Sequence, residues 1–134
     1  MQDLIDYAIG RGWGVKYRDL GRRNGEYSRG LITINDRRRT GFTIRMTMAH
    51  EIGHAHHDHA WTDDPVLSAR QEREADMFAA QILISLEEYA RAERIVGAHP
   101  GAIAKELAVT ENYVMLWREN YVQPRARLRH LRAV

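Results

Sequence analysis

Residues 43–59 have the sequence TIRMTMAHEIGHAHHDH, and their pattern predicts one long helix. Apolar side chains recur along one helical stripe, at Ile44, Met48, Ile52 and Ala55. Three further residues lie off this stripe, namely Met46, Ala49 and Gly53. The pattern therefore predicts an amphipathic helix with one buried face.

The same helix contains the motif HEIGH at residues 50–54. A helix turns about 100° per residue, so His50 and His54 lie about 40° apart on one face and can grip one Zn²⁺ ion. Zinc lowers the pKa of a bound water to near 7, and Glu51 is placed to take its proton. Gly53 has no side chain, which leaves room for another element to pack close. The alternative is a helix whose surface histidines match this short motif by chance.

A catalytic zinc needs a third protein ligand and an open position. The candidates are Glu72 and Glu74 in the next predicted helix. Glu72 is favoured because Asp76 follows it at i+4 on the same face, where it could orient a ligating histidine. Glu74 points about 200° away from Glu72. The alternative is that these acids form a solvated helix face, interleaved with arginines.

Three more histidines follow the motif, at positions 56, 57 and 59. A metzincin site would need a glycine and a histidine where His57 and Ala60 stand, so that class of site is excluded. His57 lies one turn from His54 and is a candidate contact for a substrate or a transition-state oxyanion. The alternative for all three is a solvated position at the helix C-terminus, where partial positive charge suits the helix dipole.

The rest of the chain reads as short elements separated by turn signals. Helices are predicted over residues 2–10, 69–84, 85–96, 101–107 and 110–120, and strands over residues 13–18 and 30–35. The glycines of residues 21–25 indicate a turn, so a hairpin or small sheet is expected there. Ser68 with Gln71, and Ser85 with Glu88, have the spacing of capping boxes that start helices. The expected fold class is α+β, mostly helical with a small N-terminal β-sheet.

Composition indicates one modest domain, or one domain with a small appendage. The chain has 134 residues, of which 44% are apolar and 28% charged, as is typical of globular proteins. It has no cysteine, so a metal must be held by His, Asp or Glu. No leader and no apolar run of bilayer length are found, so we expect a cytoplasmic protein without a membrane partner.

The charge of the chain is uneven. The net charge is +2, and residues 121–134 contribute +4 through Arg125, Arg127, Arg129 and Arg132, which leaves −2 (+2 minus +4) for the rest. A basic tail can contact nucleic acid or an acidic partner, or it can be a solvated terminus.

Two blocks of sequence resemble the ImmA/IrrE family of metallopeptidases. The first is RMTMAHEIGH at residues 45–54, and the second is EREADMFAAQIL at residues 72–83, in the same order as in the family. Residues 103–110, IAKELAVT, running on to Tyr113 and Val114, resemble that family's helix-turn-helix-like tail. The paired blocks are more specific than the first motif alone.

The resemblance implies a zincin-like metallopeptidase domain over residues 1–98 and a helix-turn-helix-like segment with a basic tail over residues 99–134. It implies one Zn²⁺ with three ligands, a general base, and an acid at the Asp/Asn position of the second block: His50, His54 and Glu72, then Glu51, then Asp76. Family members cleave transcriptional repressors or regulators, often of phages and mobile elements. The expected protein is a zinc endopeptidase whose partner is a DNA-binding repressor, and whose action relieves repression.

The chain departs from the family pattern in two places. Residues 55–59 replace the apolar residues that often follow the first motif. Ser85 follows Ile84 where a proline often follows the second block. Both departures leave the choice of substrate open.

Two other functions stay open on the sequence. A DNA-binding module is one, because residues 103–114 have helix-turn-helix spacing, although Ala108 stands where glycine is usual and the second helix is not strongly basic. A metal-bound regulator that binds a repressor or DNA without cutting it is the other. Glu51 favours catalysis, because it need not bind the metal. The metal could also be another divalent ion, since a site of two histidines and one glutamate accepts several.

Overall fold

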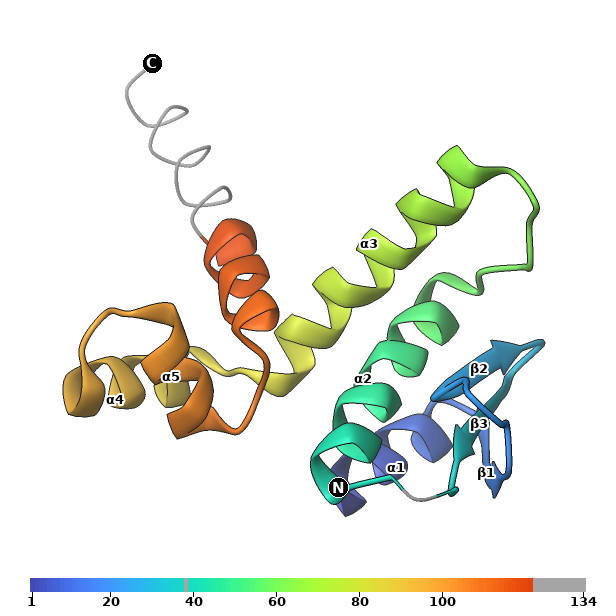
Figure 1. Cartoon of the computed structure of the whole chain (residues 1–134), viewed down its shortest axis with the longest axis horizontal. Coiled ribbons are helices and arrows are strands. Elements are labelled where there is room, and N and C mark those ends of the chain that lie inside the picture. Colours follow the sequence, from blue (N-terminus) through green and yellow to red (C-terminus); the bar gives the residue numbers. More distant parts are fainter. Residues whose placement is uncertain (38, 122–134) are drawn as a thin grey trace.

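The computed structural model describes residues 1–37 and 39–121, and its fold is α+β, as predicted. Three short strands near the N-terminus are followed by a series of helices (Figure 1). The elements are α1 (Gln2–Gly10), β1 (Gly14–Arg18), β2 (Gly25–Ser28), β3 (Leu31–Asn35), α2 (Gly41–His57), α3 (Pro65–Leu83), α4 (Leu86–Val96) and α5 (Pro100–Leu107). A further helix over residues 111–121 is called the C-terminal helix below.

Two sequence predictions concern the basic C-terminal tail and the absence of a membrane-spanning segment. The four arginines predicted to form a basic tail lie outside the described residues. Within the described part of the chain, no helix is both long enough and apolar enough to cross a membrane.

The sheet has the strand order β1-β3-β2. β1 pairs with β3 in parallel, and β2 pairs with β3 antiparallel. The predicted strands are β1 and β3, and the expected small sheet is present, but the two do not form a hairpin with each other. The hairpin joins β2 to β3 through Arg29 and Gly30, whose φ angles of 47° and 81° are both left-handed. The sequence hides this turn because Asn or Asp usually precedes the glycine.

α2 is the central element of the fold. It packs against the sheet and against α3 (Figure 1), and it also contacts α1. Thr40 caps its first turn by accepting a hydrogen bond from the backbone N–H of Thr43. Its buried residues include members of the predicted stripe and also the residues predicted to lie off it, namely Met46, Ala49 and Gly53. A helix covered by two different layers buries more than one face, which its own periodicity does not reveal.

α3 begins at Pro65, four residues before the predicted start. Asp64 caps it, because Oδ1 of Asp64 accepts a hydrogen bond from the backbone N–H of Val66 at 3.0 Å. Proline suits the first helical position, where its missing N–H would have no helical partner. The capping box predicted from Ser68 and Gln71 is therefore wrong, since both residues lie inside the helix.

α2 and α3 come very close at Gly53. A Cβ atom added to Gly53 would lie 2.2 Å from the carbonyl oxygen of Ala75 and 2.7 Å from its Cα. The expectation that Gly53 leaves room for another element is confirmed. The close approach places the residues of α3 on either side of Ala75 next to the face of α2 that contains the HEIGH motif.

α4, α5 and the C-terminal helix pack together beyond one end of α3 (Figure 1). The capping box of Ser85 and Glu88 starts α4, as predicted. Ala108 ends α5 in the left-handed conformation, with φ of 54°, at the turn position where a helix-turn-helix usually has glycine. The two helices after α4 therefore have the predicted helix-turn-helix order.

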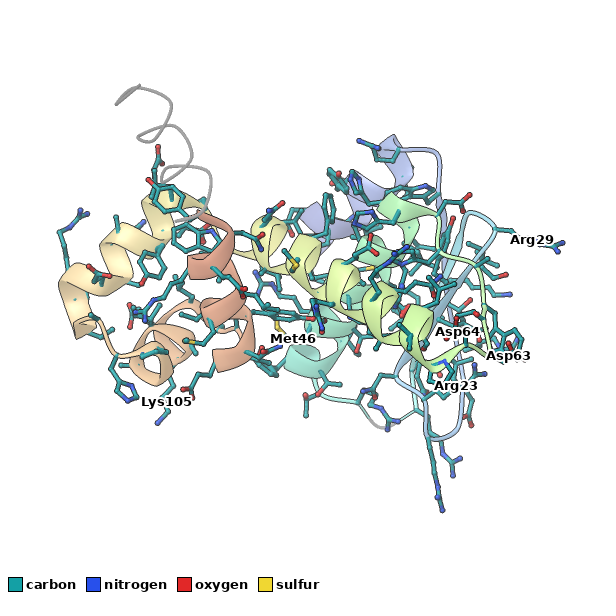
Figure 2. The ribbon with its side chains drawn as sticks, turned by 90° about the horizontal axis from the view of Figure 1, so that it is seen from above. Arg23, Arg29, Met46, Asp63, Asp64 and Lys105 are labelled. Atoms are coloured by element: carbon teal, nitrogen blue, oxygen red, sulfur yellow. The ribbon has the colours of Figure 1, made fainter. Side chains whose placement is uncertain are left out.

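One apolar core joins the two ends of the molecule. Side chains of α1, β3, α2, α3, α5 and the C-terminal helix belong to a single buried cluster. Seen from above, Lys105 of α5 and Arg29 of the hairpin lie at opposite ends, with Met46 of α2 between them (Figure 2). The predicted boundary after residue 98 stays a prediction.

Candidate metal centre

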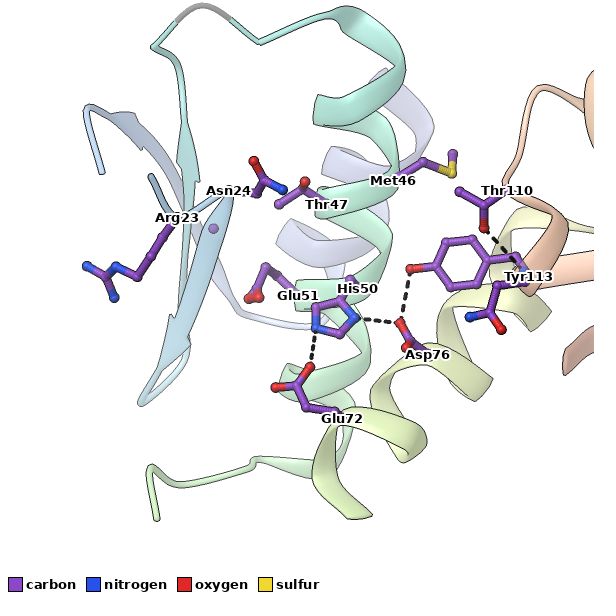
Figure 3. A pocket seen from close by; sticks show the side chains of 12 residues that line it. Arg23, Asn24, Met46, Thr47, His50, Glu51, Glu72, Asp76, Thr110 and Tyr113 are labelled. Carbon is purple, nitrogen blue, oxygen red and sulfur yellow. Dashed lines mark hydrogen bonds and ion pairs between the residues drawn. The ribbon is translucent and has the colours of Figure 1, made fainter. Parts of the chain in front are cut away.

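α2 and α3 bring five of the predicted site residues together, and Figure 3 shows His50, Glu51, Glu72 and Asp76 among them. Nε2 of His50 lies 3.1 Å from Nε2 of His54 and 2.9 Å from Oε2 of Glu72. Nε2 of His54 lies 3.3 Å from Oε1 of Glu72. Two ring nitrogens and one carboxylate therefore face a common point, with Glu51 and Asp76 beside them.

The separations suit ligands of one metal ion. Ligands about 2.1 Å from a tetrahedral zinc stand roughly 3.4 Å apart. Nδ1 of His50 lies 2.7 Å from Oδ1 of Asp76, and since a carboxylate accepts, Nδ1 carries the ring proton and a neutral ring keeps its Nε2 lone pair. Nδ1 of His54 also has a partner, Nδ1 of His59 at 2.9 Å. A cation between the two Nε2 atoms satisfies both lone pairs.

Burial and charge set the protonation of the two histidines. Burial, with the nearby charge of His50, lowers the pKa of His54 to about 4, so this ring is neutral near pH 7. Burial also lowers the pKa of His50, but the hydrogen bond to Asp76 and the charges of Glu51 and Glu72 outweigh it, so the pKa is raised. A metal ion bound at His50 therefore competes with a proton.

Glu51 is a buried carboxylate on the same turn of α2. It is 5% exposed, and burial raises its pKa to about 7 against the opposing charge of His50. Its Oε2 has no hydrogen-bond partner among the described residues. A carboxyl group with a pKa near neutrality can both take up and return a proton, as a general base requires.

Glu51 also offers an oxygen within 4.8 Å of the ligand nitrogens of His50 and His54. Glu72 is the better third ligand, because its two oxygens lie 2.9 and 3.3 Å from those nitrogens. This arrangement leaves Glu51 free for proton transfer.

The cluster opens into a pocket of about 600 Å³ (Figure 3). One wall comes from β2 and the segment before it, and another comes from the start of the C-terminal helix. A second cavity of about 240 Å³ is lined by β2 and by Trp61. Both cavities are lined by Gly25, Glu51 and Glu72, so they meet at the predicted metal ligands.

A comparison with known families agrees with this geometry. The family described as Peptidase M78, IrrE N-terminal-like domain, matches residues 10–114, which is more than half of the chain and includes the whole cluster. The chain belongs to the ImmA/IrrE family of metallopeptidases. The resemblance of the two sequence blocks is thereby confirmed. No protein of curated function matches the chain.

In this ImmA/IrrE metallopeptidase, a tyrosine of the C-terminal helix reaches the metal centre. Tyr113 is 6% exposed, and its hydroxyl donates a hydrogen bond to Oδ1 of Asp76 at 3.2 Å. Burial and the charge of Asp76 raise its pKa, so the hydroxyl stays protonated. The sequence placed Tyr113 in the helix-turn-helix-like tail, and the structure shows that it is buried and also lines the pocket.

His57 lies apart from both cavities at Glu51, whereas His59 lines the second of them. Nδ1 of His57 faces Oε2 of Glu74 at 3.6 Å, and its ring stacks on that of His59. His57 lines neither cavity at Glu51, and its role as a substrate or oxyanion contact stays a prediction. His59 has a side chain only 10% exposed and contacts His54, so it is not the solvated residue considered from the sequence.

Proposed function

We propose that this metallopeptidase is a zinc-dependent endopeptidase that cleaves a transcriptional repressor or regulator and so relieves repression. The main support is the convergence of His50, His54 and Glu72 on one point beside the buried Glu51. Three protein ligands leave the fourth position of a tetrahedral site open for chemistry. The pocket at the cluster gives a substrate access to that position.

The ligand chemistry favours zinc. Two imidazoles and one carboxylate form a donor set used by catalytic zinc sites. Each ligand ring also has a hydrogen-bond partner on the nitrogen that does not face the metal. Nδ1 of His50 contacts Asp76, and Nδ1 of His54 contacts His59. The same donors accept other divalent transition metals, so the metal found in the cell is part of the test.

The mechanism follows from the groups around the centre. When bound, the metal supplies a Lewis acid that polarises a peptide carbonyl and acidifies a water molecule. Glu51 takes the proton of that water and passes it to the nitrogen of the leaving amine. The hydroxyl of Tyr113 lines the same pocket, and its single proton, which Asp76 accepts in this structure, would have to turn toward the carbonyl oxygen to stabilise the negative charge that develops there.

An extended peptide fits the groove beside β2. β2 pairs with β3 on one side, and no other described strand pairs with it. Its residues Gly25, Glu26 and Tyr27 line the cavities that meet at the cluster. An exposed strand edge binds an extended segment through backbone hydrogen bonds. A segment held in this way continues past the cluster in both directions, which supports internal cleavage of a protein chain.

The proposal that the substrate is a repressor rests on the likeness to the ImmA/IrrE family. A regulator that binds its target without cutting it is the alternative, with DNA as a further possible target. The C-terminal helix gives DNA binding little support, because Tyr113 and Trp117 face the core and the exposed side includes Glu111 and Glu119. Arg118 is also engaged, since its guanidinium donates hydrogen bonds to Tyr89 and to the carbonyl of Ala98.

Metal content and cleavage of candidate repressors, compared between wild type and Glu51→Gln, test the proposal. We expect about one zinc per chain in both proteins and a loss of cleavage of about 10²- to 10⁴-fold in the variant, because only proton transfer is removed. Glu87→Gln, on the exposed side of α4, is the matched control and should cut like the wild type.

Four outcomes would change the proposal. A wild type that holds no metal after zinc is supplied contradicts the metal centre. If wild type cuts an unrelated unfolded protein but no repressor, the proposal that the substrate is a repressor is contradicted. Equal binding of a repressor by wild type and Glu51→Gln, without cleavage by either, supports the regulator; binding to DNA that weakens steeply with salt supports the DNA-binding alternative.

A further inference from the structure

A second group of metal-ligand atoms lies next to the first. His57, His59 and Glu74 each offer one ligand atom, and these atoms lie within 4.8 Å of one another. Nδ1 of His57 lies 3.6 Å from Oε2 of Glu74, and Nε2 of His59 lies 3.8 Å from the same oxygen. The sequence left His57 open as a substrate or oxyanion contact or a solvated residue, His59 as a solvated residue, and Glu74 as the less favoured third ligand. The proposed function uses only His59 of the three, as the hydrogen-bond partner of His54.

The spacing of this group differs from that of a hydrogen-bonded cluster. Both distances exceed the roughly 3.2 Å limit of an ordinary N–H···O bond. They are close to the roughly 3.4 Å that separates two ligands of a tetrahedral zinc ion. The stacked rings of His57 and His59 are almost parallel, with an interplanar angle of 13°. A ring nitrogen donates in the plane of its ring, so one ring must turn for both to bind the same ion.

We propose that His57, His59 and Glu74 form a second site for a divalent transition metal of the zinc class, at the rim of the catalytic centre. The ligand atoms are Nδ1 of His57, Nε2 of His59 and Oε2 of Glu74. Arg70 contacts the other oxygen, Oε1, at 3.4 Å, and so leaves Oε2 to the ion. The side chain of His57 is 33% exposed, which lets solvent complete the coordination.

The two sites are coupled through one hydrogen bond. Nδ1 of His54 lies 2.9 Å from Nδ1 of His59, and one of these nitrogens must donate to the other. When His54 binds the catalytic metal through Nε2, its ring proton is on Nδ1 and is donated to His59. The proton of a neutral His59 is then on Nε2, the atom that the second site needs.

Filling the second site therefore opposes metal binding at the first. A metal on Nε2 of His59 moves the ring proton of His59 to Nδ1, where it faces the Nδ1 proton of His54. Only one of the two rings can donate across this 2.9 Å contact, so the hydrogen bond that orients His54 is lost. The second site is accordingly weaker than the first, and excess zinc inhibits the enzyme by filling it. The coupling is reciprocal, because each ion weakens the other by the same factor.

Zinc counting on the full chain tests the second site without any activity assay. The protein is dialysed against rising Zn²⁺ concentrations, and bound zinc is measured by mass spectrometry. We expect wild type to bind a second ion, and His57→Gln and Glu74→Gln to stop at one. His56→Gln is the matched control, because His56 stacks on Phe78 outside the cluster, and it should still bind two.

Two results would overturn the second site. Wild type that saturates at one ion shows that the group does not bind zinc. A second ion that persists in both His57→Gln and Glu74→Gln binds elsewhere on the chain. Neither result bears on the peptidase proposal, which depends on the first ion and on Glu51.

The variant His50→Ala tests the coupling. Loss of the first site allows the proton of His54 to lie on Nε2, so that Nδ1 can accept a hydrogen bond from His59. The remaining zinc should then bind at the second site about 5-fold or more tightly than the second ion does in wild type. An unchanged affinity would show that the His54–His59 contact does not couple the sites. In the double variant His50→Ala/Glu74→Gln, loss of the remaining zinc ion would confirm that the ion binds at the second site.

Discussion

At the scale of single residues, Glu51 combines a buried carboxylate with proton-transfer geometry. Burial raises its pKa from 4.5 to about 7 in the folded chain, and one of its oxygens has no hydrogen-bond partner among the described residues. Loss of a proton from this site leaves a buried charge, which is unfavourable unless a bound cation compensates it. The residue that suits catalysis therefore destabilises the metal-free fold.

Glu51→Gln should make metal-free protein less sensitive to rising pH. A carboxyl whose pKa is higher in the folded state than in the unfolded state binds more protons when folded, so its contribution is fully present below about pH 4.5 and is lost as the pH rises to about 7. The free energy of unfolding of the variant relative to wild type should increase by on the order of 2 to 3 kcal/mol between pH 5 and pH 8.

Urea unfolding at the two pH values, with chelator present, measures this difference. Glu87→Gln is the control, because an exposed carboxylate on α4 should show no such gain. A difference between Glu51→Gln and wild type that is the same at both pH values would show that the folded protein does not raise the pKa of Glu51.

At the scale of elements, the contact between α2 and α3 determines the metal centre. α2 supplies both histidines and α3 supplies the carboxylates, so the site depends on how closely the two helices pack. The contact is tightest at Gly53, where the backbone of Ala75 occupies the space of a side chain. Ala75 stands between Glu72 and Asp76, and a shift of α3 at this point moves both carboxylates.

Gly53→Ala should therefore weaken both the fold and metal binding. The added methyl group would lie 2.2 Å from a backbone oxygen, so the helices must move apart. Overpacking of this kind costs about 1 to 3 kcal/mol. The unfolding temperature and the affinity for zinc are the measurements, and we expect both to be lower than in wild type.

Gly41→Ala is the matched control for this change. A Cβ atom at Gly41, in the first turn of the same helix, would meet no described atom within 4 Å. It should leave zinc affinity unchanged and keep or slightly raise stability, since alanine is the better helix former. Equal stability and zinc affinity of Gly53→Ala and wild type would show that the helices do not depend on this close approach.

At the scale of the whole molecule, the centre connects parts that are distant in the sequence. Asp76 of α3 contacts His50 of α2 and also Tyr113 of the C-terminal helix. A metal ion bound by His50, His54 and Glu72 would tie α2 to α3 and, through Asp76, hold the C-terminal helix. Metal binding should therefore stabilise the complete fold and not only the site.

Removal of the metal should lower the unfolding temperature. A ligand that binds only the folded state stabilises it by about 4 kcal/mol at a free concentration 1,000 times its dissociation constant. Calorimetry of wild type with chelator and with one equivalent of zinc measures this gain. His50→Ala should gain less from the single equivalent than wild type, because only the weaker second site can still bind zinc. An equal unfolding temperature of wild type in both conditions would mean that the ion does not bind the folded protein.

The sequence by itself determined the features that depend on local geometry. The order and type of most elements followed from periodicity, and the capping box at Ser85 followed from its spacing to Glu88. The spacing of His50 and His54 on one helix placed both imidazoles on one face, because helical pitch relates residues one turn apart wherever the helix lies. The family resemblance followed from contiguous blocks of residues.

Only the tertiary structure decided which distant groups meet. The parallel pairing of β1 with β3, the approach of Tyr113 to Asp76, and the contact of His59 with His54 all join residues through packing. Helical phase had separated Glu72 from Glu74, but it could not show that Glu74 would face two other histidines. These contacts depend on how closely elements approach, and that distance is set by the shape of the whole core, which no local pattern contains.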